Sequence, residues 1–120
     1  MTQMMSFTKY EHQVLPKFRE QLNQAESVED VKKFFIGTIQ QFLGLVTDGN
    51  LTAAYEDILL IPESESGYSL NSHITNSKEM KGIENSDLKA VISRLAEQAV
   101  HRHKHLAKNN SKTNLKIKNH

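Results

Sequence analysis

Cysteine is absent from this chain of 120 residues. The protein therefore has no disulfide framework, no thiolate metal site and no cysteine nucleophile. A small domain without such links must obtain its stability from the packing of its interior. A cysteine-free chain also fits a reducing compartment, so we expect the protein to be cytoplasmic.

Long apolar runs are absent as well. The most apolar segment, residues 28–46, contains Lys32, Lys33 and two adjacent glutamines. It therefore falls short of the ~20 consecutive apolar residues that cross a membrane. Residues 1–14 lack the apolar stretch of a signal peptide. We expect a protein that is neither secreted nor inserted in a membrane.

Catalytic motifs are missing too. The chain contains no glycine-rich phosphate loop, no Gly-x-Ser-x-Gly and no His-Glu-x-x-His. The acidic pairs Glu29/Asp30 and Glu56/Asp57 are adjacent residues, which diverge by about 100° on a helix and do not readily share an acid/base site. Helix capping and surface charge explain these pairs better. We predict a protein that is not an enzyme and that uses no cofactor.

The composition indicates one folded domain with an uneven distribution of charge. Apolar residues make up 38% and charged residues 24% of the chain, which is polar for a globular protein but not typical of a disordered one. Residues 1–97 carry 9 basic and 14 acidic side chains, a net charge of −5. Residues 98–120 carry 6 basic and no acidic side chains, together with four of the six histidines. An acidic body is thus followed by a basic C-terminal region.

Helical periodicity predicts a first helix that proline disturbs. Val14, Phe18 and Leu22 recur every four residues, as on one face of a helix. Pro16 would remove a hydrogen bond in the middle of that helix at a cost of ~3 kcal/mol. We therefore predict a break near Pro16 and a helix over about 17–25.

Two further helices have clearer ends. Ser27 is a good N-cap for a helix over residues 28–46, which Gly49 follows at its exit. Ser86 is an equivalent N-cap for a helix over residues 86–107. Both segments carry an apolar stripe at helical spacing.

A small β-hairpin is predicted between these two helices. The apolar run at 58–61, which ends at a proline, is typical of a short buried strand. Tyr68, Leu70 and Ile74 lie on one side of an alternating segment, as in a half-buried strand. The polar residues at 76–85 predict a connecting loop.

The predicted fold class is therefore mostly α. Residues 1–107 form a single compact small helical domain of three to four helices, with a small β-hairpin inserted before the C-terminal helix. Residues 108–120 contain only Leu115 and Ile117 as apolar residues, too few to offset the entropy cost of ordering them. We predict that residues 108–120 are a disordered basic C-terminal tail.

Three side chains are candidates for contacts with another protein. Phe34 and Leu45 lie outside the core stripe of the 28–46 segment, which is apolar around much of its circumference. Such a helix is either central to the fold or part of an oligomer interface. Tyr68 offers a ring and a hydroxyl group among acidic residues, a combination favoured at interfaces, although such a residue is more often the edge of a core.

The segment 101–105 contains a histidine cluster. His101 and His105 lie one helical turn apart, and Glu97 extends the same line by one turn. These three residues are candidate ligands for a metal ion such as Zn²⁺, which needs three or four converging ligands. One helix face does not close such a site, so a further ligand would have to come from Glu11, His12 or His73. An ordinary surface pair between Glu97 and His101 is the more common explanation of such a pattern.

The same region is basic. Arg102, Lys104, Lys108 and Lys112 are candidate contacts for the phosphates of a nucleic acid, through attraction that is independent of sequence. The tail lacks an aromatic residue for base stacking, and no helix pair shows a helix-turn-helix pattern. A solvated basic tail explains these residues as well.

The leading hypothesis is a small non-enzymatic cytoplasmic protein that acts by protein–protein interaction or self-association, in a regulatory or adaptor role. The alternatives are a nucleic-acid-associated accessory protein that uses the basic C-terminal region, and a metal-binding module at His101 and His105.

Overall fold

The structure, a computed structural model, describes residues 5–118, and it describes the side chains of residues 5–108. It is 66% helical. Its elements follow the chain as α1 (Thr8–Gln24), α2 (Val28–Val46), a 3₁₀ turn η1 (Tyr55–Asp57), β1 (Ile58–Leu60), β2 (Tyr68–Leu70), α3 (Ser72–Thr75), α4 (Lys78–Gly82) and α5 (Leu88–Lys118). The predicted class is confirmed: a compact, mostly α-helical protein with a two-stranded hairpin before its last helix.

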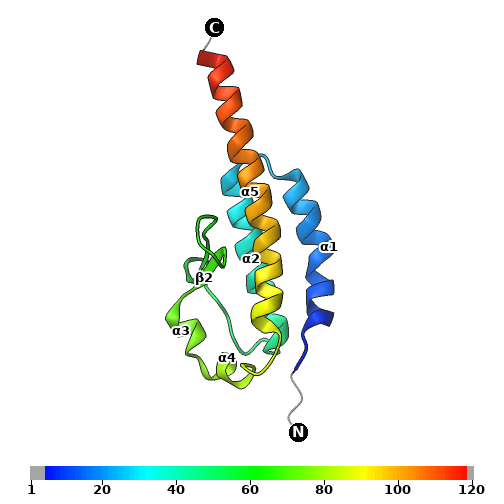
Figure 1. The fold of residues 1–120 in the computed structure, drawn as a ribbon. Coiled ribbons are helices and arrows are strands. Elements are labelled where there is room, and N and C mark those ends of the chain that lie inside the picture. The colour runs from blue at the N-terminus through cyan, green and yellow to red at the C-terminus, as the bar shows by residue number, and fades with distance from the viewer. Residues whose placement is uncertain (1–4, 119–120) are drawn as a thin grey trace.

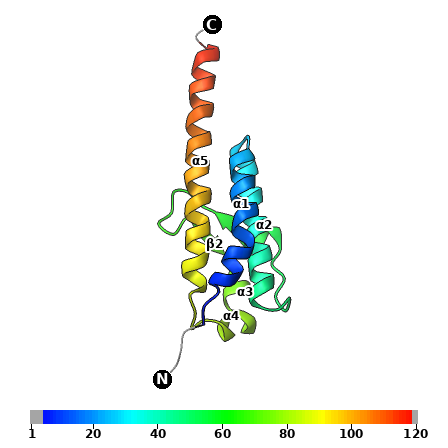
Figure 2. The same cartoon turned by 90° about the vertical axis from the view of Figure 1, so that its right-hand side faces the viewer.

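The three long helices form an up-down-up bundle (Figure 1). Helix α1 and helix α5 run in the same direction, and α2 runs between them in the opposite direction. The hairpin and the short helices α3 and α4 connect the end of α2 to the start of α5. The hairpin lies on the side of α5 that is away from α1, as the two views in Figures 1 and 2 show.

Helix α2 supplies the centre of the hydrophobic core. Phe35, Ile39 and Phe42 are completely buried, and each such side chain contributes roughly 1.5–3 kcal/mol relative to an exposed one. Val91 and Leu95 of α5 are buried just as completely. The central position of α2 explains why it is apolar around so much of its circumference.

The prediction of a break near Pro16 was wrong, because α1 is continuous from Thr8 to Gln24 with Pro16 inside it. Val14 and Phe18 on either side of the proline are buried in the core. Pro16 itself is exposed, as is His12, whose carbonyl group loses its helical partner at a proline four residues later. Solvent can hydrate that carbonyl, so burial of the apolar stripe outweighs the cost of the proline.

The predicted ends of α2 are confirmed. The Ser27 hydroxyl accepts a hydrogen bond from the Asp30 N–H at 3.1 Å, which satisfies one free donor of the first helical turn. At the other end the Gly49 N–H donates to the Gly44 carbonyl. Gly49 has φ +79°, a conformation that glycine adopts without steric cost.

The predicted two-stranded hairpin is confirmed, but the second strand is shorter than predicted. Strands β1 and β2 pair antiparallel, with Leu59 opposite Ser69. Ile74, predicted to extend the second strand, is instead a buried residue of α3. The Asn71 side chain accepts a hydrogen bond from the His73 N–H, and this cap turns the chain out of the strand into a helix.

The predicted loop at 76–85 also contains a helix. The Ser77 hydroxyl accepts a hydrogen bond from the Met80 N–H at 3.2 Å at the start of α4. Met80 is buried. One capping serine and one buried side chain therefore stabilise a single turn of helix that the polar sequence did not predict.

Helix α5 begins at Leu88 and continues to Lys118, beyond the predicted end at about residue 107. Among the α5 residues whose side chains are described, Leu106 is the last one that is buried. Beyond it, the helix projects past the ends of α1 and α2 (Figure 1). The predicted disorder of residues 108–120 falls mostly on residues whose side chains lie outside the described part, and it stays a prediction.

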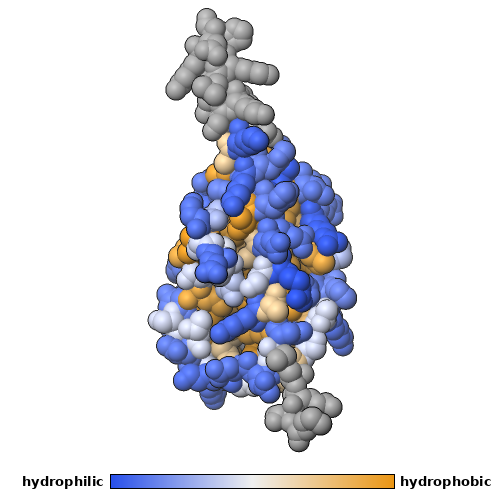
Figure 3. Space-filling model, viewed as in Figure 1, coloured by the Kyte–Doolittle hydropathy of each residue, from blue (hydrophilic) through white to orange (hydrophobic). Residues whose placement is uncertain are grey.

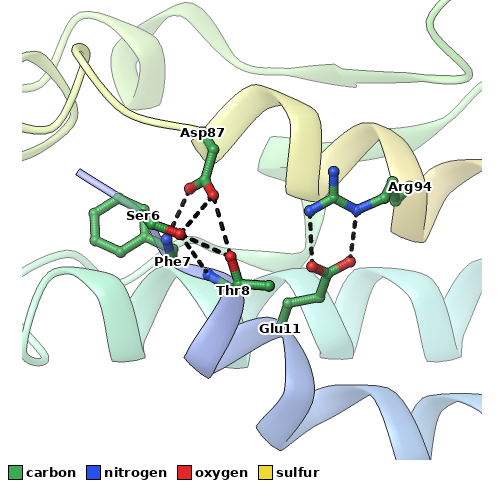
Figure 4. A network of polar contacts seen from close by, with 6 residues as sticks. All are labelled: Ser6, Phe7, Thr8, Glu11, Asp87 and Arg94. Carbon is green, nitrogen blue, oxygen red and sulfur yellow. Dashed lines mark hydrogen bonds and ion pairs between the residues drawn. The ribbon is translucent and has the colours of Figure 1, made fainter. Parts of the chain in front are cut away.

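The start of α5 is tied to the segment before α1. The Asp87 carboxylate accepts hydrogen bonds from the Phe7 N–H at 2.7 Å and from the hydroxyl groups of Ser6 and Thr8 (Figure 4). Desolvation by burial acts to raise the pKa of Asp87, but these hydrogen bonds outweigh it and the pKa lies below its ordinary value. The predicted cap Ser86 accepts a hydrogen bond from the Leu88 N–H at 3.2 Å at the start of α5, while the Asp87 side chain holds the N-terminal segment.

Within residues 5–118, no helix combines the length and the apolar character that crossing a membrane requires.

Candidate functional site

A groove of about 870 Å³ lies between α1 and α5. Both helices contribute polar side chains to it, with one leucine among them. Its lining residues are Arg19, Leu22, Asn23, Arg94, Glu97, Gln98, His101, Arg102 and His105.

Helical periodicity brings these residues to one groove. On α5, Arg94, Gln98, His101 and His105 follow one another at intervals of three or four residues, so they share a face. Helices α1 and α5 run parallel, and Arg19, Leu22 and Asn23 of α1 line the groove opposite that face. The groove therefore collects cationic side chains from two helices that are distant in sequence.

An ion pair that includes the lining residue Arg94 joins the two helices. The Arg94 guanidinium donates to both carboxylate oxygens of Glu11, at 2.8 and 2.9 Å (Figure 4). The Glu11 side chain is only 7% exposed, whereas that of Arg94 is 49% exposed. The hydrogen bonds to Glu11 raise the pKa of Arg94 above its ordinary value.

Arg102 lies further along the groove and contacts the end of α1. Its Nη2 donates to the carbonyl oxygens of Asn23 and Ala25, at 3.3 and 3.1 Å. These carbonyls lie at the C-terminal end of α1, where backbone acceptors lack helical partners and a positive charge is favourable. Arg102 Nε is buried and has no hydrogen-bond partner within the described residues.

Two of the three arginines in the groove have no carboxylate partner among the described residues. Arg94 is paired with Glu11. Arg19 donates through Nε to the Gln98 side-chain oxygen at 3.3 Å, and Arg102 contacts only backbone carbonyls. Glu97 is the one acidic residue that lines the groove. The groove thus presents two guanidinium groups to an incoming anion.

The structure brings the three candidate metal ligands Glu97, His101 and His105 to this same groove. However, no group of three or more histidine, aspartate or glutamate side chains in the described part of the chain is arranged to hold a metal ion. Of the additional ligands considered, Glu11 is paired with Arg94 and His73 is bonded to Asp57. The metal hypothesis gains no support from this arrangement.

The three candidate interaction residues are not brought together. Phe34 and Leu45 are partly buried on α2, and Tyr68 is partly buried on β2. Phe34 lines a smaller groove of about 370 Å³ between α1 and α2, beside the exposed Tyr55. Each of the three residues packs against the core, so most of the apolar surface that they offer is already used.

Of the four candidate nucleic-acid contacts, Arg102 is held by the end of α1. Lys104 and Lys108 are exposed on α5. The Lys112 side chain lies outside the described part of the chain. The structure therefore separates these residues into one cation that supports the fold and lysines that project from it.

Sequence reasoning missed a pair between the buried Asp57 and the exposed His73. The Asp57 carboxylate lies 2.7 Å from Nε2 of His73 and also accepts a hydrogen bond from the Ala54 N–H at 2.9 Å. The Ala54 N–H and then His73 lower the pKa of Asp57 below its ordinary value. The prediction that Asp57 is a surface charge or cap was therefore incomplete, because only the fold brings residue 73 to the end of η1.

Large apolar side chains are sparsely exposed. Among the described residues only Met5, Tyr55 and Leu59 are large, apolar and exposed. On the face shown in Figure 3, hydrophilic residues predominate and the hydrophobic areas are small and scattered. A partner that binds this surface must therefore be recognised mainly through polar and charged groups.

The chain matches no protein-family model, and neither curated proteins nor solved structures give a significant match to it.

Proposed function

We propose that this is a non-enzymatic protein that acts by binding another protein, and that the groove between α1 and α5 holds an acidic segment of that partner. The observation that carries this proposal is the pair of guanidinium groups, Arg19 and Arg102, which both line the groove without a carboxylate partner among the described residues. Arginine is enriched at protein interfaces because its planar fork binds a carboxylate through two hydrogen bonds.

The distribution of charged residues in the groove and over the rest of the protein favours a short acidic segment over an extended polyanion. Arg94 is already neutralised by Glu11, and Glu97 adds a negative charge. The rest of the body is acidic, with a net charge of −5 over residues 1–97. A run of phosphates along the body would be repelled, whereas one or two carboxylates match the two guanidinium groups that line the groove.

The test is a binding measurement with a labelled oligoglutamate peptide, followed by fluorescence anisotropy at low salt. We expect saturable binding that Arg19→Gln weakens by about tenfold, the loss of one charge-assisted hydrogen-bonded contact. Lys81→Gln is the matched control, because Lys81 is exposed on α4 and outside the groove. Equal binding by the wild-type protein and both variants would contradict the proposal.

A second candidate function is sequence-independent contact with a nucleic acid. It is favoured by one observation: α5 continues to Lys118 and carries all six basic residues of the region 98–120. A labelled single-stranded oligonucleotide serves as the probe. Binding that falls steeply with salt, is lost on deleting residues 107–120 and is unaffected by Arg19→Gln would place nucleic-acid contact ahead of the groove.

A further inference from the structure

The groove has a counterpart on the opposite side of the molecule. The turn that joins β1 to β2 carries Glu63 and Glu65, both exposed. Neither carboxylate has an ion pair or hydrogen-bond partner among the described residues. Glu63 lies close enough to His103 of α5 to interact with it electrostatically. The molecule thus presents two acidic groups without an ion pair at one place and two guanidinium groups without a carboxylate at another.

The acidic turn is held in a defined shape. The Ile61 N–H donates to the Gly67 carbonyl at 2.8 Å, and the Gly67 N–H donates to the Ser64 hydroxyl at 2.9 Å. The Ser64 hydroxyl in turn donates to the Ile61 carbonyl. Gly67 packs so closely against α5 that a Cβ atom there would lie 3.2 Å from Val100. A rigid turn loses little conformational entropy when it binds.

The turn and the groove lie on opposite sides of α5. Figures 1 and 2 show that the turn between β1 and β2 lies on the side of α5 away from α1, whereas the groove lies between α5 and α1. The turn of one molecule therefore cannot reach its own groove. It remains accessible to the groove of a second molecule.

From this placement, and resting on the function proposed above, we propose that the partner is a second copy of this chain. The Glu63–Glu65 turn of one copy enters the groove of the next, with its two carboxylates against Arg19 and Arg102. Because the two surfaces differ and face opposite ways, the contact is head-to-tail and generates chains or rings. A contact this small and charged is weak, reversible and sensitive to salt.

The first measurement is the mass of the purified full-length protein by sedimentation velocity, over a range of concentrations and at low and high salt. The proposal predicts an average mass that rises with concentration at low salt and returns to the monomer value at high salt. A monomer under all conditions overturns it. If the oligoglutamate peptide still binds in an Arg19-dependent manner, the function proposed for the groove survives that failure.

Charge reversal then tests which surfaces meet. The double variant Glu63→Lys/Glu65→Lys and the single variant Arg19→Glu should each be monomeric alone, because each places like charges in contact. Mixed together, they should associate again, since the unaltered acidic turn of the Arg19→Glu variant fits the unaltered groove of the turn variant. Recovery in the mixture is a result that mere misfolding of either variant does not produce.

Matched controls carry the same changes in charge at other exposed positions. Glu56→Lys/Glu84→Lys has the charge of the turn variant, and Lys81→Glu has that of the groove variant. Both should associate like the wild type. If these controls lose association as fully as the turn and groove variants do, net charge and not the specific contact is responsible, and the proposal fails.

Discussion

Glu11 of α1 and Arg94 of α5 are joined by two parallel hydrogen bonds, although they stand 83 residues apart in the chain. The pair fixes the parallel alignment of the two helices near their N-terminal ends. Its two members differ in environment, since the carboxylate is buried and the guanidinium is half exposed. Removing the arginine therefore leaves an unpaired buried charge, whereas removing both residues does not.

From this asymmetry we predict the order of two stabilities. Arg94→Met should lower the free energy of unfolding by about 1–3 kcal/mol, because the Glu11 carboxylate stays buried without its partner. The double variant Glu11→Met/Arg94→Met should be more stable than Arg94→Met. Urea denaturation at neutral pH measures both free energies of unfolding. A double variant less stable than Arg94→Met would show that leaving the Glu11 carboxylate buried and unpaired is not the main cost.

Asp87 makes the stability depend on pH in the acid range. Its pKa in the folded protein lies below the ordinary value of 3.8, so its stabilising contribution is complete above that value. As the pH falls, the unfolded chain takes up a proton first, and the contribution is lost progressively as the pH passes through the folded pKa.

We therefore expect Asp87→Asn to cost about 1–2 kcal/mol at neutral pH, from weakened hydrogen bonds to Phe7, Ser6 and Thr8. The difference from the wild type should shrink as the pH falls below 3.8. Denaturation at a series of pH values tests this, with Glu84→Gln as a control that should show neither effect. A difference that does not change with pH would remove the role assigned to the Asp87 charge.

Two glycines with positive φ offer a comparison of strain with crowding. Gly49 has φ +79° and open space where a Cβ would lie, whereas Gly67 has φ +83° and would meet Val100 at 3.2 Å. Gly49→Ala should therefore cost about 1 kcal/mol, from backbone strain alone. Gly67→Ala should cost a further 1 kcal/mol or more, on the order of an overpacked contact. Thermal melting of both variants decides, and equal losses would show that the hairpin moves away from α5 freely.

The continuity of α1 predicts a stabilising substitution. Pro16 lies on the exposed face of an intact helix, so Pro16→Ala should restore a helical hydrogen bond and raise the free energy of unfolding by about 1–2 kcal/mol. This gain is smaller than the full cost of a proline, because alanine also frees the unfolded chain. Gln13→Ala, at another exposed position of α1, should change stability by less than about 0.5 kcal/mol. A Pro16→Ala protein that melts below the wild type would mean that the proline assists packing.

Local chemistry explains which parts of the fold were predictable. The N-cap Ser27 and the apolar stripe of α2 act within a few residues of each other, so their pattern is complete in the sequence. Pro16 misled the prediction because its cost is local, while the burial of Phe18 that outweighs it depends on α2. The helical turns at Ile74 and Met80 were missed for the same reason, since each is held by one buried side chain in a polar segment.

The candidate site was predictable only in part. The spacing of Glu97, His101 and His105 placed these residues on one helix face, and all three line the groove. Arg19 comes from a helix about 80 residues earlier, and no local pattern in the sequence links it to them.

The amino-acid sequence by itself determined the helical class, the ends of α2, the hairpin before α5 and the contrast between an acidic body and a basic C-terminal region. These features depend on side-chain periodicity, capping and charge, which act over a few residues or over the composition as a whole. Only the tertiary structure decided that Glu11 meets Arg94, that Arg102 caps α1, and that the acidic turn lies opposite the arginine groove. Such contacts depend on how α1 and α5 align across the core, a relation that the local order of residues does not encode.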